Sequence, residues 1–315
     1  MNAIKDFLLL VRWKNLLFIA LTQVLFFYGV AHQVLAGTQH ITRELNILFW
    51  VLCISSVLIA AAGYIINDYF DLNIDLVNKP ARMVVDKGIS RRWAIFLHLV
   101  FSVAGILLGF YIGLENGNWL IGIANTACVF VLWFYSTSFK KRLLIGNILI
   151  SVLTGWTVLV VYFFVVFHHP QNWFELIPVE MLQKFLRLAI LYSSFAFIIT
   201  LIREVVKDIE DVEGDRKYGC RTMPIVWGTD FSRIFAATWL VILLVLLLVV
   251  LFYILQFGMW IPAAYNLVMV VVPAFYCFYL LLKAKSTADY ARLSSWIKAV
   301  IFTGILSMLL FKIFG

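Results

Sequence analysis

The chain has 315 residues, of which 63% are hydrophobic and only 13% are charged, and its mean hydropathy is +0.97. A soluble domain of this size carries about twice that share of charged residues. The composition excludes a soluble protein and predicts an integral membrane protein. The net charge of +8 does not indicate nucleic-acid binding, because the cations are concentrated in alternate loops between apolar segments.

Nine apolar stretches, bounded by charged residues, prolines or glycines, have the length of about 20 residues that a helix needs to cross a bilayer. We expect membrane-spanning helices over residues 15–36, 46–66, 93–114, 119–139, 144–167, 185–203, 234–256, 260–282 and 294–314. The first stretch has no small-residue cleavage pattern and is longer than a signal-peptide core. We therefore expect it to be retained as a helix.

Lysine and arginine are concentrated before the first span and after the second, fourth, sixth and eighth spans. The loops on the other side are nearly bare, holding single cations such as Arg43 and Lys184. By the positive-inside rule, the N-terminus and the basic segments lie in the cytoplasm. We expect an integral protein of the cell inner membrane with this orientation.

Two acidic runs interrupt the apolar chain, one after the second span and one after the sixth. Asp68, Asp71 and Asp75 stand at i, i+3 and i+7 in the first run, and the second run repeats this spacing with Asp208, Asp211 and Asp215. On a continuous helix this spacing directs three carboxylates to one face, which in the second run extends back to Glu204. Because an ionised carboxylate in an apolar medium is costly unless it meets a cation, the two runs predict a shared metal site on the cytoplasmic side.

Magnesium prefers oxygen ligands and is usually held by one or two carboxylates together with substrate phosphates. Lysines and arginines flank both acidic runs, so a magnesium diphosphate would find carboxylates for the metal and cations for the remaining phosphate oxygens. Mn²⁺ would fit the same ligands. At a membrane the matching substrate is a diphosphate on a lipid tail, such as a polyisoprenyl diphosphate, with the tail in an apolar groove between helices.

The motifs Asn67-Asp68-x-x-Asp71-x-x-x-Asp75 and Asp208-x-x-Asp211-x-x-x-Asp215 resemble the two signatures of the UbiA superfamily of intramembrane prenyltransferases. The second is followed by Gly219-x-Arg221-Thr222-x-Pro224, and the motifs also lie after the second and sixth spans, as in that family. The resemblance covers nearly the whole chain. It implies an all-α fold: a polytopic membrane protein in which residues 1–315 form a single domain of about nine transmembrane helices around a central cytoplasm-facing cavity.

The resemblance also implies an activity, the Mg²⁺-dependent transfer of a prenyl group from a prenyl diphosphate to an acceptor through an allylic carbocation. The candidate catalytic and metal-binding residues are Asp68, Asp71, Asp75, Asp208, Asp211 and Asp215. The candidate substrate-binding residues are Asn67, Arg82, Tyr135, Lys140, Lys141, Lys207, Arg12 and Asn15.

Two features leave alternatives open among these candidates. Arg12 and Asn15 resemble the family's Arg-x-x-Asn entry to the first helix, but an interfacial anchor would use the same residues. After the first motif, Arg82 is followed by Met83-Val84-Val85-Asp86 instead of the family's common Pro-Leu, which weakens assignments copied from ubiquinone-pathway enzymes.

The acceptor is the least determined part of the prediction. The second motif and its Gly-x-Arg-Thr tail most resemble the branch of geranylgeranylglycerol-phosphate geranylgeranyltransferases, together with homogentisate and chlorophyll-type enzymes. An aromatic acceptor of quinone biosynthesis, such as 4-hydroxybenzoate or dihydroxynaphthoate, is the alternative. From another class, a membrane cation transporter would place its acidic residues near the middle of spans. We expect the lipid bilayer, a prenyl donor and a prenyl acceptor as partners, with no nucleic acid and no obligate protein partner.

Overall fold

The computed structural model describes residues 3–38, 40–78, 83–168 and 177–314. Nine helical segments within these residues are long and apolar enough to cross a membrane, which confirms the predicted helical membrane fold. Their bounds are Trp13–Val34, Arg43–Phe70, Arg91–Asn116, Leu120–Thr137, Ile145–Val166, Val179–Glu210, Thr229–Gln256, Trp260–Lys283 and Thr287–Phe314. Apart from one isolated bridge between Val85 and Ile89, the described residues contain no β structure.

Several spans consist of more than one helical element, and short helices lie between them. In the N-terminal half the elements are α1 (Ala3–Leu10), α2 (Trp13–Leu25), η1 (Phe26–Ala31), α3 (His32–Val34), α4 (Arg43–Phe70), α5 (Leu72–Asn78), α6 (Arg91–Asn116), α7 (Leu120–Thr137), η3 (Phe139–Lys141) and α8 (Ile145–Val166). In the C-terminal half they are α10 (Val179–Glu210), α11 (Val212–Lys217), α12 (Met223–Val226), α13 (Thr229–Gln256), α14 (Trp260–Tyr265), η4 (Asn266–Val271), α15 (Val272–Lys283), α16 (Thr287–Leu306) and α17 (Met308–Phe314). The elements η1 and η4 are π-helical turns inside the first and eighth spans.

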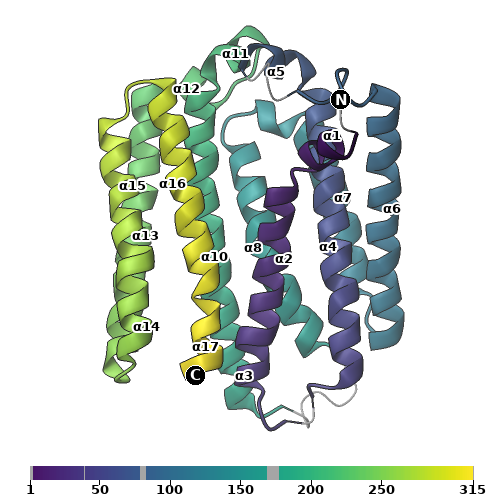
Figure 1. Ribbon diagram of the computed structural model, residues 1–315, viewed down its shortest axis with the longest axis vertical. Helices are drawn as coiled ribbons and strands as arrows, with labels where there is room; N and C mark the ends of the chain where they lie inside the picture. The colour runs from purple at the N-terminus through teal and green to yellow at the C-terminus, as the bar shows by residue number, and fades with distance from the viewer. Residues whose placement is uncertain (1–2, 39, 79–82, 169–176, 315) are drawn as a thin grey trace.

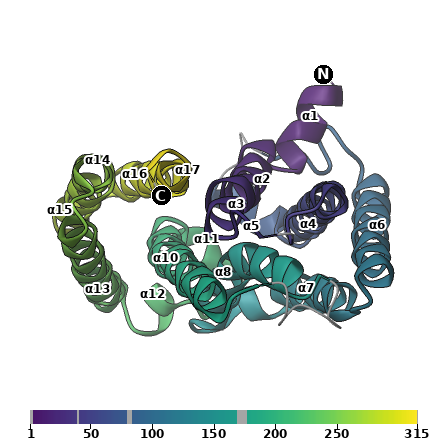
Figure 2. The same ribbon diagram turned by 90° about the horizontal axis from the view of Figure 1, so that it is seen from below.

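The spans run along the long axis of the molecule and are arranged around it (Figures 1 and 2). Helix α10 joins the two halves, because it packs against α8 on one side and against α13 and α16 on the other. On the opposite side α16 contacts α2, and α17 contacts η1. The first and ninth spans therefore close the bundle.

Three clusters of buried apolar side chains hold the bundle together. One surrounds Phe26, Phe27 and Phe49 between the first, second and fifth spans, and another joins α10, α13, α15 and α16. A smaller cluster packs α1 against α4 and α6 near the N-terminus. Outside these clusters, large apolar side chains such as Phe252 and Phe275 are more than half exposed, as a surface in contact with lipid requires.

Local signals in the sequence set several helix ends. Thr42 Oγ1 accepts a hydrogen bond from the Leu45 amide at the start of α4, and Ser286 with Asp289 forms a capping box at the start of α16. Helix α6 ends at Gly117, whose φ of 65° lies in the left-handed region that glycine adopts without a steric penalty.

Two helices extend beyond the apolar stretches that predicted them. Helix α4 continues to Phe70 and α10 continues to Glu210. The first aspartate of each acidic run therefore lies on a spanning helix, and the remaining two follow at or after its end.

Candidate active site

Both acidic runs lie at the same end of the bundle, where α5 and α11 are neighbours (Figure 1). We call this the acidic end. The spacing predicted one continuous helix through each run, but each helix is interrupted at the middle aspartate. Asp71 has φ −89° and ψ 0°, and Asp211 has φ −98° and ψ 7°. This is the bridge region between helix and strand, where many active-site residues sit.

The interruption changes the environment of the third aspartate in each run. Asp75 and Asp215 lie in the first turns of the short helices α5 and α11. A carboxylate in a first turn is stabilised by the partial positive charge at the helix N-terminus. The amides of Asp71 and Asp211 still bond to the carbonyls of Asn67 and Lys207, and the amides of Asp75 and Asp215 bond to the carbonyls of Asp71 and Asp211.

The first acidic run is bound by cations that come from other helices. Arg12 Nη2 donates to Asp68 Oδ1 at 2.5 Å, and Lys140 Nζ donates to Asp71 Oδ1. Asn67 Nδ2 donates to the other oxygen of Asp71 at 2.8 Å, and Asn67 Oδ1 accepts from Lys140 at 3.3 Å. The Lys140 side chain is only 10% exposed, so this pair is largely shielded from solvent.

Arg12 occupies a strained position between α1 and α2. Its φ of 51° and ψ of 53° are left-handed, a conformation that costs about 1 kcal/mol for a residue with a side chain. Burial acts to lower the Arg12 pKa, but Asp68, Tyr64 and Asp71 together outweigh it and the pKa is raised. The guanidinium also lies 5.2 Å from the ring centroid of Tyr64. The turn between α1 and α2 therefore places a positive charge next to α4.

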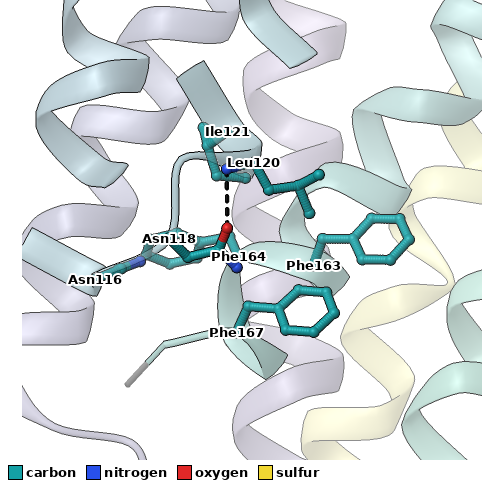
Figure 3. Close-up of a pocket in the computed structure, with 7 residues that line it drawn as sticks. All are labelled: Asn116, Asn118, Leu120, Ile121, Phe163, Phe164 and Phe167. Carbon is teal, nitrogen blue, oxygen red and sulfur yellow. Dashed lines mark hydrogen bonds between the residues drawn. The ribbon is translucent and has the colours of Figure 1, made fainter. Parts of the chain in front are cut away.

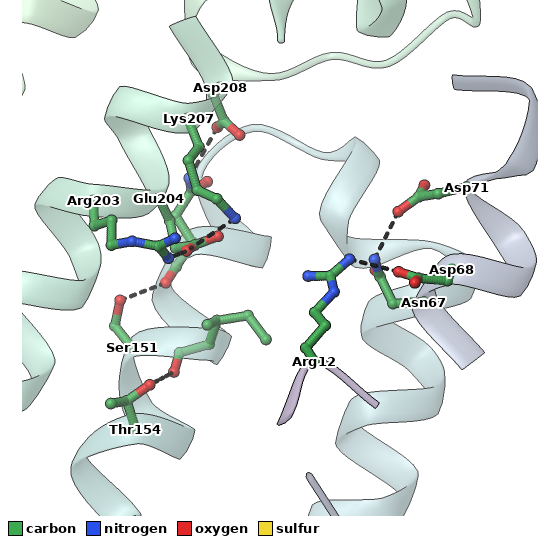
Figure 4. A network of polar contacts seen from close by, with 12 residues as sticks. Arg12, Asn67, Asp68, Asp71, Ser151, Thr154, Arg203, Glu204, Lys207 and Asp208 are labelled. Atoms are coloured by element: carbon green, nitrogen blue, oxygen red, sulfur yellow. Dashed lines mark hydrogen bonds and ion pairs between the residues drawn. The ribbon is translucent and has the colours of Figure 1, made fainter. Parts of the chain in front are cut away.

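The second acidic run faces the first across the bundle (Figure 4). Asn147 Nδ2 of α8 donates to Asp208 Oδ2 at 2.9 Å. One turn earlier on α10, Glu204 Oε1 accepts from Arg203 Nη1 at 2.9 Å and lies 3.6 Å from Lys207 Nζ. The α10 side of the site thus contains both carboxylates and cations.

Contacts between distant segments bring the two runs together. Asn78 of α5 donates to the Asp211 carbonyl at 3.0 Å and accepts from the Gly214 amide at 2.9 Å. The Tyr135 side chain, from α7, is within electrostatic range of Asp71 and Asp208. The runs, more than 130 residues apart in sequence, therefore form one site.

The loops beside the runs are also tied to the site. The Arg221 amide donates to the Lys141 carbonyl at 2.8 Å. Cys220 is within electrostatic range of Asp215, Asp71, Lys140 and Lys141. Burial, together with the Asp215 charge, raises the pKa of the Cys220 thiol to about 11.

A preformed metal cage is not seen: the described residues hold no group of three or more His, Cys, Asp or Glu side chains placed to bind a metal ion. The carboxylates nevertheless fit magnesium, because Mg²⁺ usually takes only one or two of them and completes its shell with water and substrate phosphate. Two of these carboxylates, Asp68 and Asp71, already form ion pairs with the cations Arg12 and Lys140. The donor set is oxygen-only and suits a metal that arrives together with a diphosphate.

The structure places most of the predicted candidates at the acidic end. Asn15 contacts the Tyr64 hydroxyl beside Arg12. Arg82 lies outside the described residues. Sequence reasoning missed Tyr64, Asn78 and Asn147. Their only signal was a polar side chain at the end of an apolar span or in the segment that follows it.

A small pocket at the opposite end of the bundle is not a substrate site. Its volume is about 10 Å³, room for a single water molecule. Figure 3 shows its lining, where Asn118 Oδ1 accepts from the Leu120 amide at 2.9 Å beside Phe163 and Phe167.

A sequence model of the UbiA prenyltransferase family matches residues 12–304, which include both acidic runs. The chain belongs to the UbiA prenyltransferase family. This confirms the resemblance carried by the two motifs.

Two similar UbiA-type relatives are digeranylgeranylglyceryl phosphate synthases of archaea. The protein of Methanosphaera stadtmanae is 34% identical over 188 residues, covering 60% of this chain and 60% of the relative. That of Methanothermobacter thermautotrophicus is 37% identical over 196 residues, covering 62% of each. The chain thus spans less than two thirds of the length of these relatives.

Solved structures of UbiA homologues share the fold. One, described for digeranylgeranylglyceryl phosphate synthase in membranes, has a TM-score of 0.60 at 23% identity and covers 98% of this chain and 99% of its own. Another, a UbiA homologue from Archaeoglobus fulgidus bound to DMAPP and Mg²⁺, has a TM-score of 0.54 at 14% identity and covers 96% and 99%.

Proposed function

We propose that the protein transfers a polyisoprenyl group from a prenyl diphosphate to geranylgeranylglycerol phosphate, in a reaction that depends on Mg²⁺. The observation that carries the proposal is the meeting of two aspartate runs and their cations at one end of a UbiA-family bundle. The names of the similar relatives support the acceptor, and the homologue bound to DMAPP and Mg²⁺ supports the donor and the metal.

The donor diphosphate would bind between the two acidic runs. Each acidic run would supply one or two carboxylate oxygens to magnesium, with the diphosphate completing the coordination, and the metal when bound would neutralise and polarise the leaving group. Lys140 and Arg12 already lie on carboxylates of the first run. On substrate binding each would exchange a carboxylate oxygen for a phosphate oxygen, while the carboxylate it releases would become available to the metal that accompanies the diphosphate.

The transfer step then needs little further chemistry from the protein. The allylic C–O bond breaks and its electron pair leaves with the diphosphate. The acceptor hydroxyl oxygen bonds to the allylic carbon, and its proton passes to water or to a nearby carboxylate. The cations around the runs stabilise charge on the leaving group, which is the largest contribution such a site can make.

The orientation of the protein belongs to the same proposal. The basic segments at the acidic end favour a cytoplasmic active site and N-terminus, in the cell's inner membrane. We also propose that residues 1–315 act as a single domain without an obligate protein partner.

Product analysis with purified protein tests the acceptor. We expect labelled geranylgeranyl diphosphate and Mg²⁺ to yield an ether lipid with geranylgeranylglycerol phosphate. In the same panel, 4-hydroxybenzoate, dihydroxynaphthoate and homogentisate should remain unprenylated. Transfer to an aromatic acceptor with none to the glycerol phosphate would reject the proposed acceptor while leaving the family assignment unchanged.

A further inference from the structure

A group of charged side chains on α10 lies deeper in the bundle than the aspartates of the second run. It consists of Arg203, Glu204 and Lys207, and Figure 4 shows it on the α10 side of the site, across from Arg12 and the first run. Arg203 precedes Asp208 by five residues, which on a helix is a distance of about 7.5 Å along the axis. Arg203 is therefore displaced from Asp208 toward the membrane interior.

One edge of the Arg203 guanidinium donates a hydrogen bond to Glu204, and Nε on the other edge has no hydrogen-bond partner among the described residues. Its Nη1 donates to Glu204 at 2.9 Å. Its Nε is buried and has no hydrogen-bond partner among the described residues, and its side chain is only 14% exposed. A buried donor without a partner costs about 1 to 3 kcal/mol, and an ionised side chain inside a spanning helix is a functional candidate by default.

Glu204 does not need Arg203 to balance its negative charge. Glu204 also lies 3.6 Å from Lys207 and within electrostatic range of Arg12. Taken alone, Arg203, Glu204 and Lys207 carry a net charge of +1, and Asp208 follows them on the same helix. The feature that distinguishes the group is therefore the buried Arg203 Nε, which has no hydrogen-bond partner among the described residues.

We propose that Arg203, oriented by Glu204, binds the phosphate group of the acceptor and selects phosphorylated acceptors. The inference rests on the proposed function, since it assigns the acceptor half of the same site. The Nε edge of a guanidinium presents two parallel N–H groups that match two phosphate oxygens. The axial offset from Asp208 suits an acceptor whose hydroxyl reaches the allylic carbon beside the diphosphate while its own phosphate lies a few bonds away.

Steady-state kinetics with two acceptors tests the assignment. Geranylgeranylglycerol phosphate is compared with geranylgeranylglycerol, which lacks the phosphate, for the wild type and for Arg203→Gln and Arg203→Lys. We expect Arg203→Gln to raise KM for the phosphorylated acceptor at least about tenfold, the size of one lost charged hydrogen bond. KM for geranylgeranyl diphosphate should change by less than about twofold. The ratio of kcat/KM for the phosphorylated acceptor to kcat/KM for the unphosphorylated one should fall at least about tenfold. Arg203→Lys keeps the charge without the planar fork and should recover only part of the preference.

Arg187→Gln is the matched control, because Arg187 is an exposed arginine on the same helix at the other end of the bundle. Arg187→Gln should leave KM unchanged both for geranylgeranylglycerol phosphate and for geranylgeranyl diphosphate. If Arg203→Gln turns over too slowly for kinetics, equilibrium binding of labelled geranylgeranylglycerol phosphate to the detergent-purified variant gives the same comparison.

Two results would overturn the inference while leaving the proposed function in place. One is an Arg203→Gln variant whose KM rises for geranylgeranyl diphosphate instead of the acceptor, which would place Arg203 in the donor site. The other is an unchanged preference between the two acceptors. A wild-type protein that makes no product from geranylgeranylglycerol phosphate would reject the proposed function itself, before any variant is compared.

Discussion

Asp68 and Asp71, which would serve as metal ligands, are already bonded to basic side chains. Arg12 holds Asp68, and Lys140 holds Asp71. These ion pairs place a cation beside each carboxylate at the end of a membrane helix, where an isolated charge would be costly. In the proposed mechanism each cation would turn from its carboxylate to a phosphate oxygen when substrate binds.

Removal of a motif aspartate should abolish most of the activity without unfolding the protein. We expect Asp71→Ala or Asp211→Ala to lower turnover by at least about a hundredfold, because the transition state loses charge stabilisation. The measurement is the initial rate of prenyl transfer at saturating donor and Mg²⁺.

Glu180→Ala provides the comparison, because Glu180 is an exposed carboxylate at the far end of α10. Its rate should match the wild type. Aspartate variants that remain active, or that lose activity only because they fail to fold in the membrane, would show that these residues are structural.

The Cys220 thiol beside the second run should be unreactive near neutral pH. Burial and the Asp215 charge raise its pKa to about 11, so almost none of the reactive thiolate is present at pH 7. We expect N-ethylmaleimide to leave activity unchanged at pH 7 and to inactivate progressively faster as the pH rises toward 11. Cys220→Ser should remove that pH-dependent inactivation, and rapid inactivation of the wild type at pH 7 would contradict the buried position of the thiol.

At the scale of helices, the contact between α5 and α11 is the feature that unites the site. Two hydrogen bonds from one side chain, Asn78, contribute about 2 kcal/mol to it. Gly214 is required at the contact because a Cβ there would overlap the Asn78 side chain.

Loss of this contact should slow the reaction. We expect Asn78→Ala, or Gly214→Ala, to lower turnover about tenfold, since the second run is no longer held against the first. Asn73→Ala, an exposed asparagine on the same helix, should have wild-type turnover. The comparison requires equal yields of folded protein by size-exclusion chromatography, and equal turnover of Asn78→Ala and Asn73→Ala would show that the contact is dispensable.

Hydropathy predicted where the spans lie, but it could not predict where the helices end. The sixth span was expected over residues 185–203, and the helix extends over Val179–Glu210. The helix continues past its apolar centre through polar residues such as Lys184 and Lys207, so hydropathy alone cannot predict where it ends.

The composition of the site was more predictable than its geometry. The aspartate spacing identified both runs, yet it could not reveal the interruptions at Asp71 and Asp211, because a helical spacing pattern assumes an unbroken helix. The role of Asn78 was invisible, since its partners lie more than 130 residues away and no local pattern encodes them.

For the whole molecule, activity should require a hard divalent cation. Carboxylates alone would repel a diphosphate, and the oxygen-only site suits Mg²⁺ or Mn²⁺. We expect excess EDTA to abolish transfer, Mg²⁺ or Mn²⁺ to restore it and Zn²⁺ to restore it poorly. Full activity in the chelator would reject the mechanism.

The orientation of the protein in the membrane can be tested by the accessibility of introduced cysteines. We expect a cysteine introduced at Lys285 to be protected from a membrane-impermeant maleimide in intact spheroplasts, and one introduced at Gln256 to be labelled. Both positions are exposed; Gln256 ends the seventh span and Lys285 follows the eighth, so they lie on opposite sides of the membrane. Both cysteines are introduced into a variant in which the four native cysteines, Cys53, Cys128, Cys220 and Cys277, have been replaced. The opposite labelling pattern would show that the proposed topology is inverted.

The packing of the first span against the ninth constrains how a cell can make this protein. The Gly29 backbone lies so close to the Met308 carbonyl that a Cβ would be 2.7 Å from its oxygen, and the Phe18 and Phe302 rings are 5.8 Å apart. During synthesis the first span enters the membrane long before the ninth leaves the ribosome, so its packing surface waits in lipid for a partner. The same span carries Gln23, which is fully buried in the finished bundle and donates to Ser56 Oγ of the second span at 2.9 Å and to the Thr157 carbonyl of the fifth at 3.3 Å. Biogenesis must therefore shelter a polar group in the bilayer until later spans arrive, which makes the order of insertion a source of misassembly in its own right.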